Sequence, residues 1–143
     1  MNMDSVPVAE EITSPAPAKE LCVLVVDDSA TIRRSAETML ANEGCRVVTA
    51  ENGSIGYELF QEAEQRSEYF DAVITDMQMP LMTGYELAAA IRPSSSVPII
   101  ALTAFTQEED EDKCLQAGCS AYLTKPIDTN TFAAQVAELI RNI

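Results

Sequence analysis

The sequence predicts an α/β fold in which a doubly wound parallel sheet of five strands is covered by five helices. Two observations lead to this prediction. Apolar runs rich in β-branched residues, such as 21–26 and 70–75, are typical of strands buried on both faces. These runs alternate with segments of helical periodicity, the pattern of parallel strands joined by right-handed helical crossovers. The chain has 143 residues, enough to bury such a core in one domain.

The first 20 residues differ from the rest in composition. Pro7, Pro15 and Pro17 stand among Ala, Glu and Ser, with no sustained helical or strand period. We therefore expect a flexible leader at 1–20 and a folded domain at 21–143.

The first two strands are expected at 21–26 and 46–50, with a helix between them. Ser29 can cap this helix and Gly44 can end it. Its apolar positions follow the i, i+4, i+7, i+8 pattern of one helical face: Ile32, Ala36, Met39 and Leu40.

A second helix should follow the turn at Asn52 and Gly53, and the third strand should run over 71–75. The apolar side chains of this helix lie close to one face: Tyr57, Phe60 and Ala63. A loop bounded by Pro80 and Gly84 then leads to a third helix at about 85–91.

The fourth strand is expected at 97–102 and the fifth at 121–124. Between them, Thr106 and Glu109 stand three apart, the spacing of a capping box, and predict a fourth helix that Gly118 ends. A last helix at about 129–142 carries its apolar residues on one stripe: Phe132, Val136, Leu139 and Ile140.

Composition excludes several classes of function. The formal net charge of −14 should repel nucleic acid and anionic lipid, so we do not expect direct DNA binding. The chain has no histidine, which excludes Ser/His/Asp catalysis and a role as a phosphohistidine carrier. No run has transmembrane length and no secretory signal is present. The cysteines lack zinc or redox spacing and are expected to be reduced apolar residues of a cytoplasmic protein: Cys22, Cys45, Cys114 and Cys119.

Polar residues follow four of the five predicted strands: Asp27 and Asp28, Asp76, Thr103, and Lys125. The carboxyl ends of parallel strands form the ligand crevice of such sheets. Three carboxylates in one crevice suit a hard cation, and Mg²⁺ in particular takes a few carboxylates together with waters and phosphate oxygens. A lone carboxylate can attack phosphorus while Mg²⁺ and a lysine neutralise the phosphoryl oxygens. A purely structural ion pair of Lys125 with one aspartate is the simpler alternative, but it would leave two carboxylates without a cation.

Four motifs carry a resemblance to a known family: residues 25–29 (VVDDS), 75–84 (TDMQMPLMTG), 100–104 (IALTA) and 117–126, which contains AG and YLTKP. Together they resemble the receiver domain of two-component response regulators, including the single-domain chemotaxis regulator and the receivers of hybrid histidine kinases. The spacings between Asp28, Asp76, Thr103 and Lys125 agree with that family. The resemblance implies a flavodoxin-like fold with strand order 2-1-3-4-5.

The resemblance also implies roles at the site. Asp76 would be the phosphorylated aspartate and a ligand of Mg²⁺. Asp28 would bind the metal directly, Asp27 largely through water, and Gln78 through its backbone carbonyl. Lys125 would hold the phosphoryl oxygens.

Further implied roles concern switching and lifetime. Thr103 would move toward the phosphoryl group and the ring of Tyr122 would turn inward, which reshapes the surface of the fourth helix, fifth strand and fifth helix. Gln78 and Phe105 would tune the lifetime of the phosphoryl group, and Pro126 would follow a cis bond.

Two features are peculiar to this sequence. Thr83 stands where the family often has an acidic or other polar residue, although the site itself is untouched. The acidic run 108–112 is expected to be a solvated helix start rather than a dedicated site for a basic partner.

The expected function is that of a phosphoacceptor which catalyses its own phosphorylation and slow hydrolysis as a signalling switch. One alternative is a degenerate receiver that binds proteins without phosphorylation, against which the intact site residues speak. Another is a phosphohydrolase similar to the haloacid dehalogenase group, but Gln78 stands where such enzymes carry an aspartate.

Because the chain lacks histidine, the phosphoryl donor must act in trans. The expected donors are a histidine kinase, a histidine phosphotransfer domain or a small acyl phosphate. The sequence ends after the last predicted helix, so we expect output by contact with a downstream protein. A stand-alone regulator and a receiver of a hybrid kinase both remain open.

Overall fold

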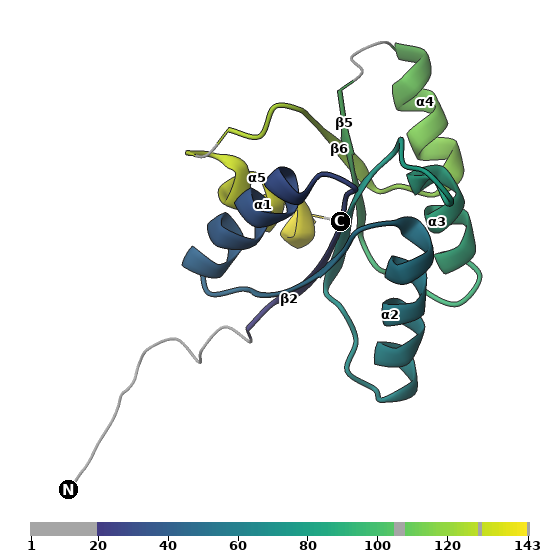
Figure 1. Cartoon of the computed structure of the whole chain (residues 1–143), viewed down its shortest axis with the longest axis horizontal. Coiled ribbons are helices and arrows are strands. Elements are labelled where there is room, and N and C mark those ends of the chain that lie inside the picture. The colour runs from purple at the N-terminus through teal and green to yellow at the C-terminus, as the bar shows by residue number, and fades with distance from the viewer. Residues whose placement is uncertain (1–19, 105–107, 129, 143) are drawn as a thin grey trace, which may run out of the picture.

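The computed structural model describes residues 20–104, 108–128 and 130–142, which form a parallel sheet between two layers of helices (Figure 1). All four pairings between neighbouring strands are parallel. Across the sheet the strands lie in the order β3 (Arg46–Ala50), β2 (Cys22–Val26), β4 (Ala72–Asp76), β5 (Ile99–Thr103) and β6 (Ala121–Thr124). Numbered along the chain this is 2-1-3-4-5, so the expected fold and strand order are confirmed. The expected leader lies almost wholly outside the described residues.

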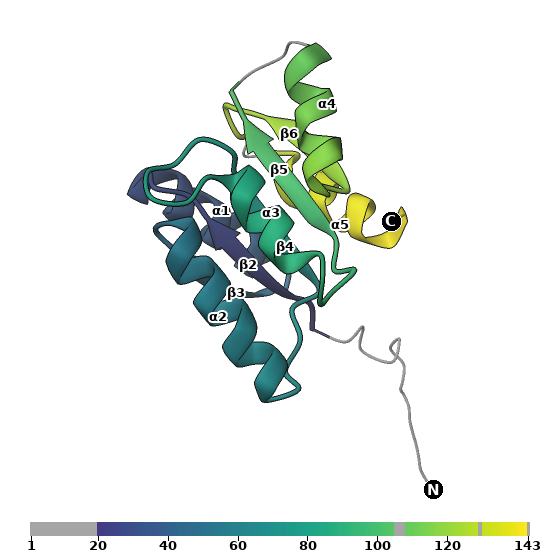
Figure 2. The ribbon, with the colours of Figure 1, turned by 90° about the vertical axis from the view of Figure 1, so that its right-hand side faces the viewer.

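The five helices divide between the two faces of the sheet. They are α1 (Ala30–Asn42), α2 (Gly53–Gln65), α3 (Gly84–Ile91), α4 (Glu108–Ala117) and α5 (Phe132–Asn142). Figures 1 and 2 show α1 and α5 on one face and α2, α3 and α4 on the other. None of the helices in the described part of the chain is long and apolar enough to cross a bilayer.

The alternating side chains of the central strands supply two separate cores. Val23 and Val25 of β2 pack toward α1 and α5, together with Leu40 and Phe132. Leu24 and Val26 point the other way, toward the apolar faces of α2 and α3. Because β2 is fully buried from Val23 to Val26, it has no solvent-facing side, as the apolar run predicts.

The predicted helix ends are largely found. The Ser29 side chain accepts a hydrogen bond from the Ile32 N–H, and the Asn52 side chain accepts one from the Ile55 N–H. Gly118 has a φ of +109°, the left-handed region that glycine adopts without strain at the end of a helix. The capping box predicted at Thr106 and Glu109 lies outside the described side chains.

Several element boundaries differ from the predicted ones by one to three residues. β4 begins and ends one residue later than expected, at Ala72 and Asp76. β5 begins at Ile99 rather than at residue 97, because Pro98 has no N–H to give to the sheet. α5 begins at Phe132 rather than near residue 129, after a turn in which the Asp128 carbonyl accepts from the Phe132 N–H.

None of the four cysteines forms a disulfide in the described part of the chain, as expected. Cys114 and Cys119 are buried in the core, and Cys22 and Cys45 are half-buried. Burial raises the pKa of the Cys119 thiol to about 12. These residues therefore act as small apolar side chains, as the sequence predicts.

Candidate functional site

The register of the sheet brings the polar strand ends together. Val26 pairs with Thr75, so the residues that follow, Asp27 and Asp76, lie at the ends of adjacent strands on the same edge of the sheet. On the other side of β4, Thr103 is the last residue of β5 and pairs with Thr124, directly before Lys125. Residues far apart in the sequence thus meet at the carboxyl edge of the sheet.

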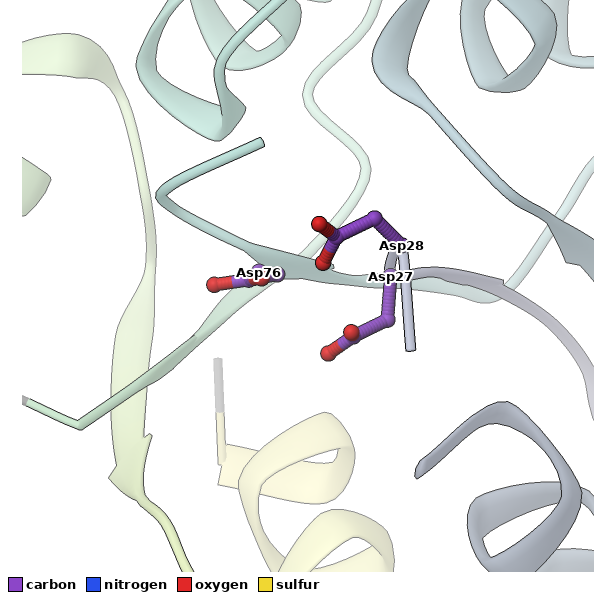
Figure 3. A group of neighbouring side chains, drawn as sticks. All are labelled: Asp27, Asp28 and Asp76. Carbon is purple, nitrogen blue, oxygen red and sulfur yellow. The ribbon is translucent and has the colours of Figure 1, made fainter. Parts of the chain in front are cut away.

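Three carboxylates form the centre of this edge. Asp27, Asp28 and Asp76 each offer an oxygen atom, and these atoms lie within 4.8 Å of one another. Figure 3 shows the side chains of the consecutive residues Asp27 and Asp28 pointing to opposite sides of the chain, with the Asp76 side chain beside them. Asp27 is fully buried and Asp76 is 7% exposed, whereas Asp28 is open to solvent. The cluster therefore has a closed side and an open side.

Asp27 is held at several points. Its N–H donates to the Ala50 carbonyl at 3.1 Å, and its Oδ1 accepts from the Ser29 N–H at 2.9 Å. Its own carbonyl oxygen accepts from the guanidinium of Arg33 at 2.7 Å. Its Oδ2 is buried and accepts no hydrogen bond from the described residues, and its ion-pair partner there is the ammonium of Lys125 at 3.2 Å. A buried carboxylate oxygen in that state is suited to a cation.

Lys125 supplies a positive charge to the site. Its Nζ lies 3.2 Å from Oδ2 of Asp27 and 3.4 Å from Oδ2 of Asp76. Its backbone N–H donates to the carbonyl of Thr103 at 2.7 Å, which ties the end of β6 to the end of β5. The Lys125–Pro126 bond is cis, as the resemblance implies.

The electrostatics of Asp76 favour binding of a cation. Burial raises the pKa of its carboxyl above the ordinary value, and the nearby Asp27 adds to this effect. The Gln78 N–H, which donates to Oδ1 of Asp76 at 3.1 Å, and the ammonium of Lys125 lower the pKa without cancelling the rise. The protein groups around Asp76 thus stabilise its negative charge less than water would.

A small cavity of about 190 Å³ opens beside these groups. It is lined by Asp76, Gln78, Thr103, Ala104 and Lys125. A carboxylate, an ammonium and a hydroxyl thus face one space, with the acidic cluster at its side. The donor set and the buried Oδ2 of Asp27 fit Mg²⁺, which takes carboxylate and carbonyl oxygens together with waters.

The loop from β4 to α3 packs against the backbone of Asp76. Gly84 packs so closely that a Cβ atom there would overlap the carbonyl oxygen of Asp76 and lie 2.8 Å from Cα of Met77. Thr83 begins α3 in a capping box: its side chain accepts from the Glu86 N–H at 3.1 Å, and the Glu86 carboxylate accepts from the Thr83 N–H at 2.9 Å. Thr83, the departure from the family pattern, therefore has a structural role.

Tyr122 lies on β6, outside the cavity that the acidic cluster borders. Its hydroxyl donates to Oε2 of Glu111 on α4 at 3.1 Å, and this bond raises the pKa of the phenol. Thr103 is buried at the end of β5. Phe105, expected to tune the lifetime of the phosphoryl group, lies outside the described residues, whereas Gln78 is exposed next to Asp76.

The sequence analysis did not identify three residues around the site. They are Arg33, which binds the Asp27 carbonyl, Glu86, which completes the cap of α3, and Glu111, which binds Tyr122. Glu86 could have been found from the Thr83-x-x-Glu86 spacing, which has the capping-box form. The other two contacts depend on side-chain directions that no sequence pattern records.

Comparison with known proteins agrees with this geometry. Residues 23–137 match the family model of the response regulator receiver domain. The chain is 38% identical over 119 residues to a probable transcriptional regulator, ycf27, of Porphyra purpurea, and 32% identical over 111 residues to hybrid signal transduction histidine kinase I of Dictyostelium discoideum. These matches cover 83% and 74% of this chain, but only 47% and 6% of the two relatives.

A solved structure is similar over nearly its whole length. The chemotaxis protein CheY4 of Vibrio cholerae superposes with a TM-score of 0.77 at 32% identity, covering 85% of this chain and 99% of that one. The chain therefore belongs to the response regulator receiver domain family of two-component signalling.

Proposed function

We propose that residues 21–143 form a receiver domain that takes a phosphoryl group onto Asp76 in a Mg²⁺-dependent reaction. The observation that carries this proposal is the arrangement of Asp76 beside Asp27, Asp28 and Lys125 at a cavity of about 190 Å³. Asp28 would bind the metal directly, Asp27 largely through water, and Gln78 through its backbone carbonyl, with Asp76 completing the protein ligands. When bound, Mg²⁺ would neutralise charge on the phosphoryl oxygens.

The nucleophile in this proposal is a carboxylate oxygen of Asp76. It forms the new O–P bond as the P–N bond of a phosphohistidine, or the P–O bond of an acyl phosphate, breaks, and the electron pair leaves with the donor. Lys125 already lies 3.4 Å from Oδ2 of Asp76, so its ammonium needs only a small movement to bind a phosphoryl oxygen. The Thr103 hydroxyl, which lines the same cavity, is a second donor.

The donor must come from outside these 143 residues, since they contain no histidine. A histidine kinase or a histidine phosphotransfer domain is the proposed partner, and the similarity to a hybrid kinase supports it. We assign the output to a downstream protein that binds the surface around α4, β6 and α5, and the location to the cytoplasm.

Switching would couple the site to that surface. In the proposed active state Thr103 moves toward the phosphoryl group and the Tyr122 ring turns inward, which breaks its bond to Glu111. Gln78 and Phe105 would tune how long the state lasts. A receiver that works only as a phosphorylation-independent binding module is not favoured, because Asp76, Lys125 and the acidic pair are all in place.

Labelling by a small acyl phosphate tests the reaction. Acetyl phosphate with Mg²⁺ should add one phosphoryl group per chain, and chelation of the metal or the variant Asp28→Ala should slow the labelling by about two orders of magnitude. Asp112→Ala removes an exposed carboxylate away from the site and is the matched control. Labelling that proceeds equally fast after chelation and in Asp28→Ala would contradict the proposal.

A further inference from the structure

Arg33 extends from the first turns of α1 back to the acidic cluster. Its backbone N–H closes the helix onto the Ser29 carbonyl at 3.0 Å, so the residue is fixed to α1. Its guanidinium donates to the carbonyl oxygen of Asp27 at 2.7 Å, and the side chain is half-buried. The neighbouring Arg34 is exposed to solvent. Two adjacent arginines of equal charge therefore have different surroundings.

The bond from Arg33 acts on the peptide unit that joins the two acidic residues. The carbonyl of Asp27 and the N–H of Asp28 belong to one planar group, so fixing that carbonyl restricts the orientation of the plane that contains both Cα atoms. The other contacts of Asp27, through its N–H, its Oδ1 and the ion pair of its Oδ2 with Lys125, do not involve this carbonyl.

Charge alone cannot explain why a guanidinium lies here. A cation next to a site for a divalent metal repels that metal and lowers its affinity. A favourable contribution of Arg33 to metal binding must therefore be geometric. Metal sites depend in this way on outer residues that orient the ligands.

We propose that Arg33 is a positioning residue, which presents the carboxylates of Asp27 and Asp28 to Mg²⁺ by fixing the peptide unit between them. This inference rests on the proposed function. The positioning role predicts selectivity for Mg²⁺ over Ca²⁺ as well as higher affinity for Mg²⁺. Mg²⁺ demands near-ideal octahedral geometry, whereas Ca²⁺ accepts flexible arrangements of oxygen ligands. Loosening the peptide unit should weaken Mg²⁺ binding more than Ca²⁺ binding.

Titration of the unphosphorylated protein with each metal tests the inference, with binding followed by calorimetry and by amide NMR signals around Asp28. Arg33→Ala should weaken Mg²⁺ binding by about tenfold and Ca²⁺ binding by less. Arg34→Ala removes the same charge without removing the bond, so its Mg²⁺ affinity should be equal or slightly higher. Arg33→Lys keeps the charge but has a shorter side chain without the planar guanidinium, and should fall between wild type and Arg33→Ala.

The outcomes separate the inference from the proposed function. If wild type binds Mg²⁺ but Arg33→Ala binds it as well as Arg34→Ala does, or more tightly, the positioning role is overturned and the metal site stands. An equal loss for Mg²⁺ and Ca²⁺ overturns the selectivity argument. If wild type itself does not bind Mg²⁺, both fail. Should Arg33→Ala not fold, Arg33→Lys decides the matter, since unchanged Mg²⁺ affinity at constant charge would contradict the role.

Discussion

The ammonium nitrogen of Lys125 lies 3.4 Å from Oδ2 of Asp76, within the distance of an ion pair. The same nitrogen lies 3.2 Å from Oδ2 of Asp27, so one lysine contacts both the proposed phosphoacceptor and a proposed metal ligand. Lys125 therefore competes with a metal ion for carboxylate charge before the reaction, and it is in place to bind a phosphoryl oxygen during it.

Removing Lys125 should have opposite effects on binding and on reaction. In Lys125→Ala, Mg²⁺ affinity should rise a few-fold because a competing cation is lost. Labelling by acetyl phosphate should slow by about 10²-fold, since one donor to the charged phosphoryl oxygens is missing. Metal titration and labelling rates measure the two effects, with Lys113→Ala on the exposed side of α4 as control. A fall in both quantities would mean that Lys125 acts mainly by holding the fold.

Gly84 should tolerate no side chain. A Cβ atom there would overlap the carbonyl oxygen of Asp76, so Gly84→Ala must displace the end of β4. We expect a loss of about 2 kcal/mol in the free energy of unfolding, with weaker Mg²⁺ binding in the folded protein.

Gly44→Ala is the control for this prediction. Its Cβ would meet no atom within 4 Å, but the φ of +86° there costs a side chain about 1 kcal/mol. Denaturation and metal titration together separate the two variants. Unchanged Mg²⁺ affinity in Gly84→Ala would show that the contact behind Asp76 does not shape the site.

Glu111 should hold Tyr122 in the conformation that the structure describes. Because the hydroxyl of Tyr122 donates to Glu111, Glu111→Ala removes a contact that the proposed inward turn of the ring would break. If Tyr122 turns inward on activation, the affinity for beryllofluoride, a mimic of the phosphoryl group, should rise by about two- to fivefold through reciprocal coupling. The pKa of the phenol should also fall toward its ordinary value, which an ultraviolet titration measures.

Asp112→Ala is the matched control for this experiment, since it removes one exposed charge from the same helix. Equal beryllofluoride affinities in Glu111→Ala and Asp112→Ala would exclude the restraining role of Glu111. Tyr122→Phe, which lacks the hydroxyl, should behave like Glu111→Ala.

The pKa of Asp76 gives a prediction for stability without metal. Burial raises this pKa in the folded state, so the folded protein holds the proton more tightly than the unfolded chain does. The contribution of Asp76 to stability therefore falls as the pH rises from acid to neutral.

Asp76→Asn cannot ionise, so in a chelating buffer at neutral pH it should be more stable than wild type. The difference should shrink well below the ordinary Asp pKa of about 3.9, where both proteins are uncharged at this position. Chemical denaturation across this pH range measures it, with Asp112→Asn as control. A wild type more stable than Asp76→Asn at neutral pH would contradict the cause assigned to the shift.

The fold and the centre of the site could be predicted because they follow from local patterns. Apolar runs such as 70–75 indicate buried strands, and parallel pairing brings the residues after those strands, such as Asp27 and Asp76, to one edge. Their approach therefore needed no knowledge of side-chain conformations.

The supporting contacts could not be predicted, because they depend on how side chains meet across elements. Arg33 and Arg34 are adjacent residues of the same type, so the sequence does not tell them apart. The rotation of α1 about its axis relative to β2 decides which of the two arginines reaches the Asp27 carbonyl. Likewise, the contact of Glu111 with Tyr122 depends on the position of α4 over β6. Glu111 belongs to the acidic run 108–112. For the other residues of this run, a solvated helix start remains the prediction.

Mass spectrometry of the protein after reaction with acetyl phosphate and Mg²⁺ tests the central claim most directly. Wild type should gain one phosphoryl group, found in the peptide that contains Asp76. Asp76→Asn should gain none, while Asp112→Asn should be labelled like wild type. Unchanged labelling of Asp76→Asn, or a phosphoryl group located on another residue of the wild-type protein, would contradict the account.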